Sequence, residues 1–197
     1  MAAAAPPRFW NVPNSMTMGR LALAVVMFGM IAAGWYVAAL ATFGLAALTD
    51  ALDGYFARLL NQSTAIGRQL DPLVDKVMVA GAYIFLLPIA GTGLAPWMVT
   101  AIVARELFIQ WLRSLIEGRG EPFGARLAGK LKTLVQCLSI VAILLALAVK
   151  PPAAWLWGRD ALTWLAVILT LYSGLGYVLI ARTMLRAPDP IETPAGP

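Results

Sequence analysis

Residues 50–75 read DALDGYFARLLNQSTAIGRQLDPLVD and lie between two long stretches without a charged residue, 21–49 and 77–104. The aspartates of this segment are spaced i, i+3 and i, i+4, so each pair shares one face of a helix. A carboxylate is costly inside a membrane-spanning helix, and there it usually marks a functional site. The segment therefore predicts two neighbouring helices with converging acids, Asp50 and Asp53 on one and Asp71 and Asp75 on the other.

The composition of the whole chain is that of a membrane protein. Of the 197 residues, 60% are hydrophobic and 13% are charged, and the mean hydropathy is +0.77. Soluble domains are about 45–50% apolar and about 25% charged. The chain has no histidine and a single cysteine, Cys137. A soluble enzyme, imidazole catalysis, histidine-ligated zinc and an intrachain disulfide are therefore excluded.

The apolar stretches predict six spans. One helix over residues 21–49 would measure about 44 Å, more than the roughly 30 Å hydrocarbon core of a bilayer, so we expect a break at Gly34-Trp35-Tyr36. Prolines and glycines between 88 and 96 break the second stretch. The predicted spans are 20–34, 36–59, 68–88, 96–117, 128–149 and 161–183. We expect an all-α integral membrane protein with an interfacial segment at 1–19, one domain over 20–186 and a disordered tail at 187–197.

The basic residues predict how these spans are oriented. Lys150 and Arg159 lie at one set of span ends, and Arg105 lies within a span. The other twelve of the fifteen lie on the side of the two termini: Arg8, Arg20, Arg58, Arg68, Lys76, Arg113, Arg119, Arg126, Lys130, Lys132, Arg182 and Arg186. Such an excess is typical of cytoplasmic loops. We expect a protein of the cytoplasmic (inner) membrane with its acidic cluster in the cytoplasmic half.

Four converging carboxylates repel one another and need a positive partner. Carboxylate ligands select hard divalent cations such as Mg²⁺, Mn²⁺ or Ca²⁺, and two bridged metals suit phosphoryl transfer. Gly54 and Ala57 leave room for a bulky ligand, Arg58 follows where it can meet a phosphate, and Gly67 can open the next turn. The alternative is that the acids form buried ion pairs with the nearby bases Arg58, Arg68 and Lys76.

The acidic segment also carries a family resemblance. Its pattern is Asp50-x-x-Asp53-Gly54-x-x-Ala57-Arg58, then eight residues, then Gly67-x-x-x-Asp71-x-x-x-Asp75. It resembles the signature of the CDP-alcohol phosphatidyltransferase family at all eight fixed positions. The resemblance implies transfer of a phosphatidyl group from a CDP-linked lipid to an alcohol, with CMP leaving, and it suggests a homodimer. It implies that Asp50, Asp53 and Asp71 ligate two ions of Mg²⁺ or Mn²⁺, that Asp75 is the general base and also a metal ligand, and that Gly54, Ala57, Arg58 and Gly67 line the CDP-lipid site.

Three further stretches are similar to the bacterial branch of this family that makes phosphatidylglycerol phosphate. They are residues 11–20 (NVPNSMTMGR), residues 71–76 (DPLVDK), and Arg105-Glu106 together with residues 129–133 (GKLKT). This likeness implies CDP-diacylglycerol as donor and glycerol 3-phosphate as acceptor. We expect Arg105, Arg113, Lys130 and Lys132 to bind the acceptor phosphate. Alternatively, Arg105 pairs with Glu106 or an aspartate, and the other three contact lipid headgroups.

Two rival functions stay open. An acceptor other than glycerol 3-phosphate, such as inositol phosphate, serine or phosphatidylglycerol, would give a different lipid by the same mechanism. A cation transporter could use the acids as an ion site, although the outer half of the spans carries no charge to continue a path. The expected partners are CDP-diacylglycerol, glycerol 3-phosphate, membrane lipids and a second copy of the chain, without nucleic acid.

Overall fold

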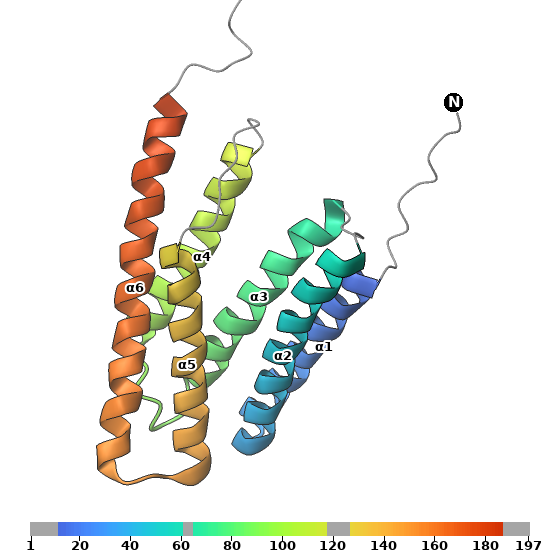
Figure 1. Cartoon of the computed structure of the whole chain (residues 1–197). Helices are drawn as coiled ribbons and strands as arrows, with labels where there is room; N and C mark the ends of the chain where they lie inside the picture. The colour runs from blue at the N-terminus through green and yellow to red at the C-terminus, as the bar shows by residue number, and fades with distance from the viewer. Residues whose placement is uncertain (1–11, 61–64, 118–126, 187–197) are drawn as a thin grey trace, which may run out of the picture. The chain divides into compact units, whose positions relative to one another are not determined.

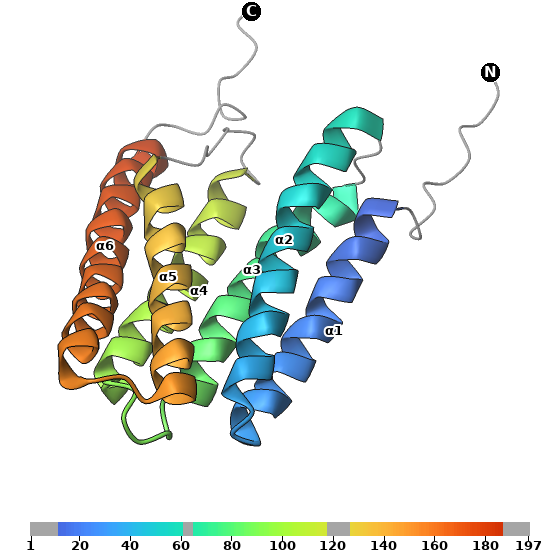
Figure 2. The same ribbon diagram turned by 60° about the horizontal axis from the view of Figure 1, so that its bottom comes forward.

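The computed structural model describes residues 12–60, 65–117 and 127–186. Within these ranges the chain forms helices and no strand: α1 (Val12–Ala32), α2 (Tyr36–Leu60), α3 (Ala65–Leu86), α4 (Pro96–Glu117), α5 (Leu127–Val149) and α6 (Ala153–Arg186) (Figures 1 and 2). Side chains at 12–13, 50–60, 65–69, 71, 117, 127–128, 180 and 183–186 lie outside the description. The all-α fold predicted from the composition is confirmed.

The break predicted at Gly34-Trp35-Tyr36 in the first apolar stretch is present, between α1 and α2. Gly34 adopts a φ of 77°, a left-handed conformation that a glycine reaches without a steric cost. The amide of Gly34 donates to the carbonyl of Ile31 at 3.1 Å, and that of Trp35 donates to the carbonyl of Met30 at 2.8 Å. This pair of bonds is a Schellman motif, which satisfies the last carbonyls of α1 and lets α2 begin at Tyr36.

Two helices are longer than the spans expected from the sequence. Helix α1 begins at Val12 rather than near residue 20, because Pro13 is tolerated in a first helical turn. Residues 12–19, expected at the membrane interface, are therefore helical and continuous with the first span. Helix α6 covers Ala153–Arg186 rather than 161–183. At about 51 Å it exceeds the thickness of the hydrocarbon core.

Three of the described helical segments are long and apolar enough to cross a membrane: Asn14–Ala32, Gly129–Val149 and Ala153–Leu179. A shorter apolar segment covers Tyr36–Thr49. The predicted spans in α3 and α4 carry charged residues within the helix, among them Asp75 and Arg105. The composition of the helices thus makes the chain a membrane protein, and the charges are concentrated where the sequence predicted chemistry.

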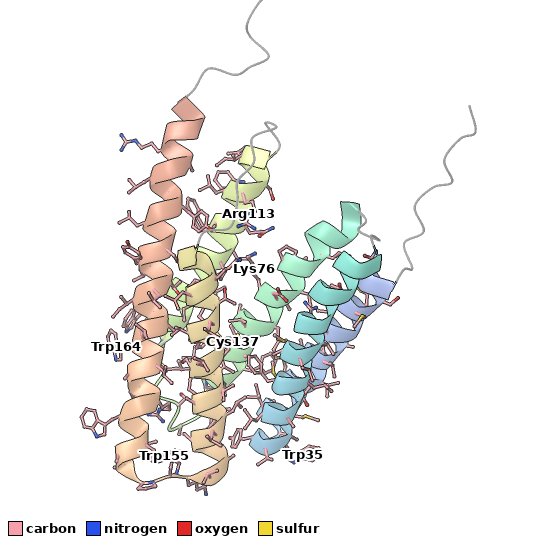
Figure 3. The ribbon with its side chains drawn as sticks, viewed as in Figure 1. Trp35, Lys76, Arg113, Cys137, Trp155 and Trp164 are labelled. Atoms are coloured by element: carbon pink, nitrogen blue, oxygen red, sulfur yellow. The ribbon has the colours of Figure 1, made fainter. Side chains whose placement is uncertain are left out.

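The chain divides into two compact units, the first of residues 1–92 and 140–156 and the second of residues 93–139 and 157–197. In the first unit α1 contacts both α2 and α3 (Figure 2). Its core includes Met27 and Ile31 of α1, Phe43 of α2 and Tyr83 of α3, all at most 2% exposed. Trp35 is exposed at the turn between α1 and α2 (Figure 3), which suits an aromatic anchor at a membrane surface.

The second unit combines an apolar cluster with buried polar contacts. Ile109, Leu112 and Ile116 of α4 pack with Tyr177 and Ala181 of α6. Between α5 and α6, the amide of Gln136 donates to the hydroxyl of Thr170 at 2.9 Å, and the hydroxyls of Ser139 and Thr163 lie 3.0 Å apart. Such bonds between helices contribute about 0.6 kcal/mol each in a membrane, and here they fix the register of α5 against α6.

Candidate active site

The four aspartates of the motif lie on two helices, as predicted. Asp50 and Asp53 are in α2, and Asp71 and Asp75 are in α3, so the members of each pair share a helix face. The side chains of Asp50, Asp53 and Asp71 lie outside the described residues. Among the side chains that are described, no three His, Cys, Asp or Glu gather. The four-carboxylate cluster therefore stays a prediction, as do the roles of residues outside the description: Gly54, Ala57, Arg58 and Gly67.

Asp75 has a partner that the sequence reasoning missed. The Nη1 atom of Arg20, in α1, donates to Oδ1 of Asp75 at 2.7 Å. The Arg20 side chain is 1% exposed, whereas that of Asp75 is 41% exposed. This arginine lies 55 residues before Asp75 in the sequence, outside the motif at 50–75. The ion-pair alternative had named only Arg58, Arg68 and Lys76 as partners for the acids.

Arg20 belongs to a buried polar stripe at the beginning of α1. Asn14, Thr17 and Arg20 are each 1% exposed, and their spacing of three residues places them along one helix face. The same face continues with the buried apolar residues Ala24 and Met27. The signal that the sequence offered was this polar stripe in line with an apolar one, because such an arrangement indicates a helix whose first turns pack against polar groups.

Lys76, next to Asp75, is oriented along its own helix. Its Nζ atom donates to the carbonyl of Pro72, one turn earlier in α3, at 3.3 Å (Figure 3). Pro72 has no amide hydrogen, so it cannot donate the backbone hydrogen bond that a helical residue normally makes to the carbonyl four residues earlier.

The second unit contains a buried cluster of opposite charges, formed by Arg105 and Glu106 of α4 with Lys132 of α5. Nη1 of Arg105 donates to Oε1 of Glu106 at 3.2 Å, and Nζ of Lys132 contacts the same oxygen. The three side chains are 10%, 7% and 5% exposed. The predicted alternative of an Arg105–Glu106 pair is thus present, and Lys132 joins it. Two buried cations thus share one oxygen of a single carboxylate.

Helix α6 holds the guanidinium of Arg105 in place. Its Nη2 donates to the hydroxyl of Ser173 at 3.0 Å, and its Cζ lies 5.5 Å from the ring centroid of Tyr177, a cation–π distance. A Cβ at Gly174 would lie 3.1 Å from Cγ of Arg105, so a glycine at this position leaves room for the arginine side chain. The Nε of Arg105 is buried and has no hydrogen-bond partner among the described residues. One donor of a fixed guanidinium is therefore unused.

The other two predicted acceptor-binding residues differ in their surroundings. Arg113 is half-buried on α4 (Figure 3), and its Nε is buried without a hydrogen-bond partner in the described part of the chain. Lys130 is exposed at the beginning of α5. Of the four predicted bases, the structure brings together Arg105 and Lys132.

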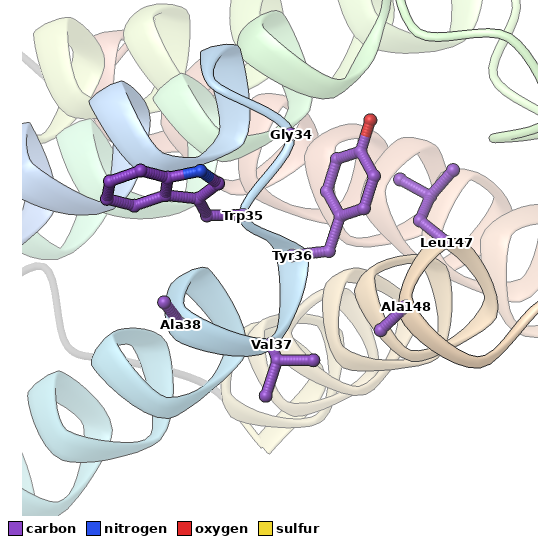
Figure 4. Close-up of a pocket in the computed structure, with 7 residues that line it drawn as sticks. All are labelled: Gly34, Trp35, Tyr36, Val37, Ala38, Leu147 and Ala148. Atoms are coloured by element: carbon purple, nitrogen blue, oxygen red, sulfur yellow. The ribbon is translucent and has the colours of Figure 1, made fainter.

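A pocket of about 370 Å³ lies at the turn between α1 and α2 (Figure 4). Its lining is Gly34, Trp35, Tyr36, Val37, Ala38, Leu147 and Ala148. None of these side chains is charged, so the pocket has nothing to neutralise a diphosphate. It also contains none of the predicted site residues, and we assign it no part in the chemistry.

Comparison with known proteins agrees with the motif. The family model described as CDP-alcohol phosphatidyltransferase matches residues 10–172. A relative from Bacillus subtilis is 37% identical over 85% of this chain and 93% of its own length. One from Pseudomonas fluorescens is 37% identical over 89% and 92%, and one from Escherichia coli is 32% identical over 89% and 97%. All three are named CDP-diacylglycerol–glycerol-3-phosphate 3-phosphatidyltransferase.

The buried charge cluster predicts a large loss of stability on Glu106→Gln. The substitution leaves two buried cations without their carboxylate, and breaking a buried pair in this way costs about 3–5 kcal/mol. We expect a lower thermal unfolding temperature in detergent, and partial recovery in the double variant Glu106→Gln/Lys132→Met, which removes one of the two uncompensated charges.

Asp160→Asn is the matched control for this prediction. Asp160 also pairs with the arginine that precedes it, Arg159, but its side chain is 42% exposed. Here only one buried cation loses a contact, and water partly screens the carboxylate, so we expect a smaller shift than for Glu106→Gln. Equal shifts for Glu106→Gln and Asp160→Asn would contradict the account of the cluster.

Proposed function

The chain belongs to the CDP-alcohol phosphatidyltransferase family, and on this basis we propose that it transfers the phosphatidyl group of CDP-diacylglycerol to glycerol 3-phosphate. The products are phosphatidylglycerol phosphate and CMP. Support for this specific acceptor comes from relatives that cover most of this chain and carry that reaction in their names. The structural observation that supports it is that Arg105 and Lys132, two of the four bases predicted to bind the acceptor phosphate, meet at Glu106.

The reaction needs a base and an oriented acceptor. A hydroxyl oxygen of glycerol 3-phosphate forms a bond to the phosphorus that carries the diacylglycerol, and the bond from that phosphorus to the CMP oxygen breaks. Asp75 takes the hydroxyl proton, for which a carboxylate must lie within hydrogen-bond reach. Arg105 and Lys132 bind the phosphate of the acceptor, a role for which fixed guanidinium donors are well suited. Arg113 and Lys130 add positive charge to the path of the anion.

The donor set fits a divalent cation. Asp50 and Asp53 are three residues apart in α2, and Asp71 and Asp75 are four residues apart in α3; carboxylates at these spacings suit Mg²⁺ or Mn²⁺. Bound there, two ions would supply charge neutralisation for the diphosphate and the leaving CMP. Gly54, Ala57, Arg58 and Gly67 line the path of the CDP-lipid in this proposal.

The protein is a membrane protein, and we propose that it lies in the cytoplasmic membrane with its site toward the cytoplasm, as the distribution of basic residues favours. The domain limits at 20 and 186 and the homodimer belong to the same proposal. The lipid donor enters from the bilayer and the product lipid stays in it, while glycerol 3-phosphate and CMP exchange with water.

The test of this function is CMP release by the purified protein with CDP-diacylglycerol and Mg²⁺. We expect release with glycerol 3-phosphate and none with serine, inositol phosphate or phosphatidylglycerol. Release with one of those acceptors would keep the mechanism and correct the acceptor. No release with any of them would contradict the transferase and favour a cation transporter.

The role of the basic cluster predicts the effect of Lys132→Met. Loss of a hydrogen bond to a charged group costs about 1.5–3 kcal/mol, so the KM for glycerol 3-phosphate should rise by roughly ten- to a hundredfold, while the KM for CDP-diacylglycerol stays unchanged. Steady-state CMP release measures both constants.

Two variants, one near each end of α5, serve for comparison. Lys130→Met, at an exposed position, should raise the same KM less. Lys150→Met, just beyond the end of α5, should leave both constants unchanged. A rise in the two KM values by the same factor in Lys132→Met would contradict a site for the acceptor phosphate.

A further inference from the structure

Arg20 is one of the largest fully buried side chains of the described residues. It lies in α1, and its Nη1 donates to Oδ1 of Asp75 in α3 at 2.7 Å. Both residues belong to the first unit. A guanidinium that is 1% exposed costs several kcal/mol in lost hydration unless partners compensate for it, and Asp75 is one such partner.

The two side chains of the pair differ in their accessibility to a ligand. Arg20 is 1% exposed and Asp75 is 41% exposed. A ligand arriving at this pair can therefore meet the carboxylate but not the guanidinium. Arg20 lies behind Asp75 and can act on a reaction only through it.

The position of Arg20 is itself fixed by the packing of α1. Asn14 and Thr17 precede it on the same buried face, and Ala24, Met27 and Ile31 follow. Because this face packs over both its polar and its apolar part, α1 cannot rotate without exposing apolar surface or burying unpaired polar groups. The guanidinium is thus a rigid support for one oxygen of the Asp75 carboxylate.

A fixed carboxylate matters for the transfer. A base works only within about 2.6–3.2 Å of the hydroxyl whose proton it takes, and a displacement of about 1 Å can cost a hundredfold in rate. An unsupported aspartate rotates about two side-chain torsions. A bond to one oxygen removes most of that freedom and points the carboxylate in one direction.

We propose that Arg20 is a positioning residue for the transfer, which holds the carboxylate of Asp75 toward the reacting groups from the buried side. The proposal rests on the proposed function, in which Asp75 takes the proton of the acceptor. In this proposal the site also includes α1, whose buried polar face lies behind Asp75.

The test compares Arg20→Met and Arg20→Lys with Arg182→Met, an exposed arginine on α6. CMP release is measured as kcat per folded protein, with the KM of both substrates and the thermal unfolding temperature in detergent. Arg20→Met should lower kcat by about a hundredfold with a smaller change in either KM. Arg20→Lys keeps the charge but lacks the planar fork, so it should recover part of kcat. Arg182→Met should equal the unsubstituted protein.

Double variants separate positioning from a purely structural role. In an Asp75→Asn background, Arg20→Lys should cause no further loss of kcat, because there is no carboxylate left to orient. A structural role would lower the unfolding temperature and the yield of folded protein, but kcat per folded molecule would stay unchanged. Arg20→Lys retains the positive charge and is expected to fold, so it tests the positioning role even where Arg20→Met does not fold.

The outcomes also separate this inference from the function on which it rests. An unchanged kcat in folded Arg20→Lys, or an equal loss with and without Asp75, would overturn the positioning role and leave the transferase in place. Absence of CMP release by the unsubstituted protein with every acceptor would overturn both.

Discussion

A charge buried among apolar helices must be paired, and this constraint governs where the polar residues of the chain lie. The described structure meets it in both units. In the first unit Arg20 is paired with Asp75. In the second, Arg105 and Lys132 share Glu106. These charges lie on α1 and α3 in the first unit and on α4 and α5 in the second.

The same constraint gives each place a different ligand preference. We expect three further carboxylates of the motif, on α2 and α3, near Asp75, and such a cluster calls for cations. At Glu106 two cations meet one carboxylate, an arrangement that suits an anion. A transferase that joins a diphosphate donor to a phosphorylated acceptor needs both kinds of site. This distribution of charge, together with the family, is why we favour glycerol 3-phosphate over an uncharged acceptor such as serine.

The sequence predicted the helices better than the contacts. The turn at Gly34 and the beginning of α4 at Pro96 followed from helix length and from glycine and proline, which act locally. The Arg105–Glu106 pair was foreseen as an alternative because the residues are neighbours. The Arg20–Asp75 pair was not, because it joins residues 55 apart and depends on how α1 packs on α3. The beginning of α1 at Val12 was also not foreseen, and residues 12–19 of the segment expected at the interface are helical.

We propose that divalent cations neutralise the carboxylates of α2 and α3, while Arg20 supports Asp75 from its buried side. The most direct measurement is anomalous diffraction from crystals of the protein grown with Mn²⁺. The account predicts manganese peaks bounded by Asp50, Asp53, Asp71 and Asp75. Carboxylates without manganese, paired instead with Arg58, Arg68 or Lys76, would contradict it.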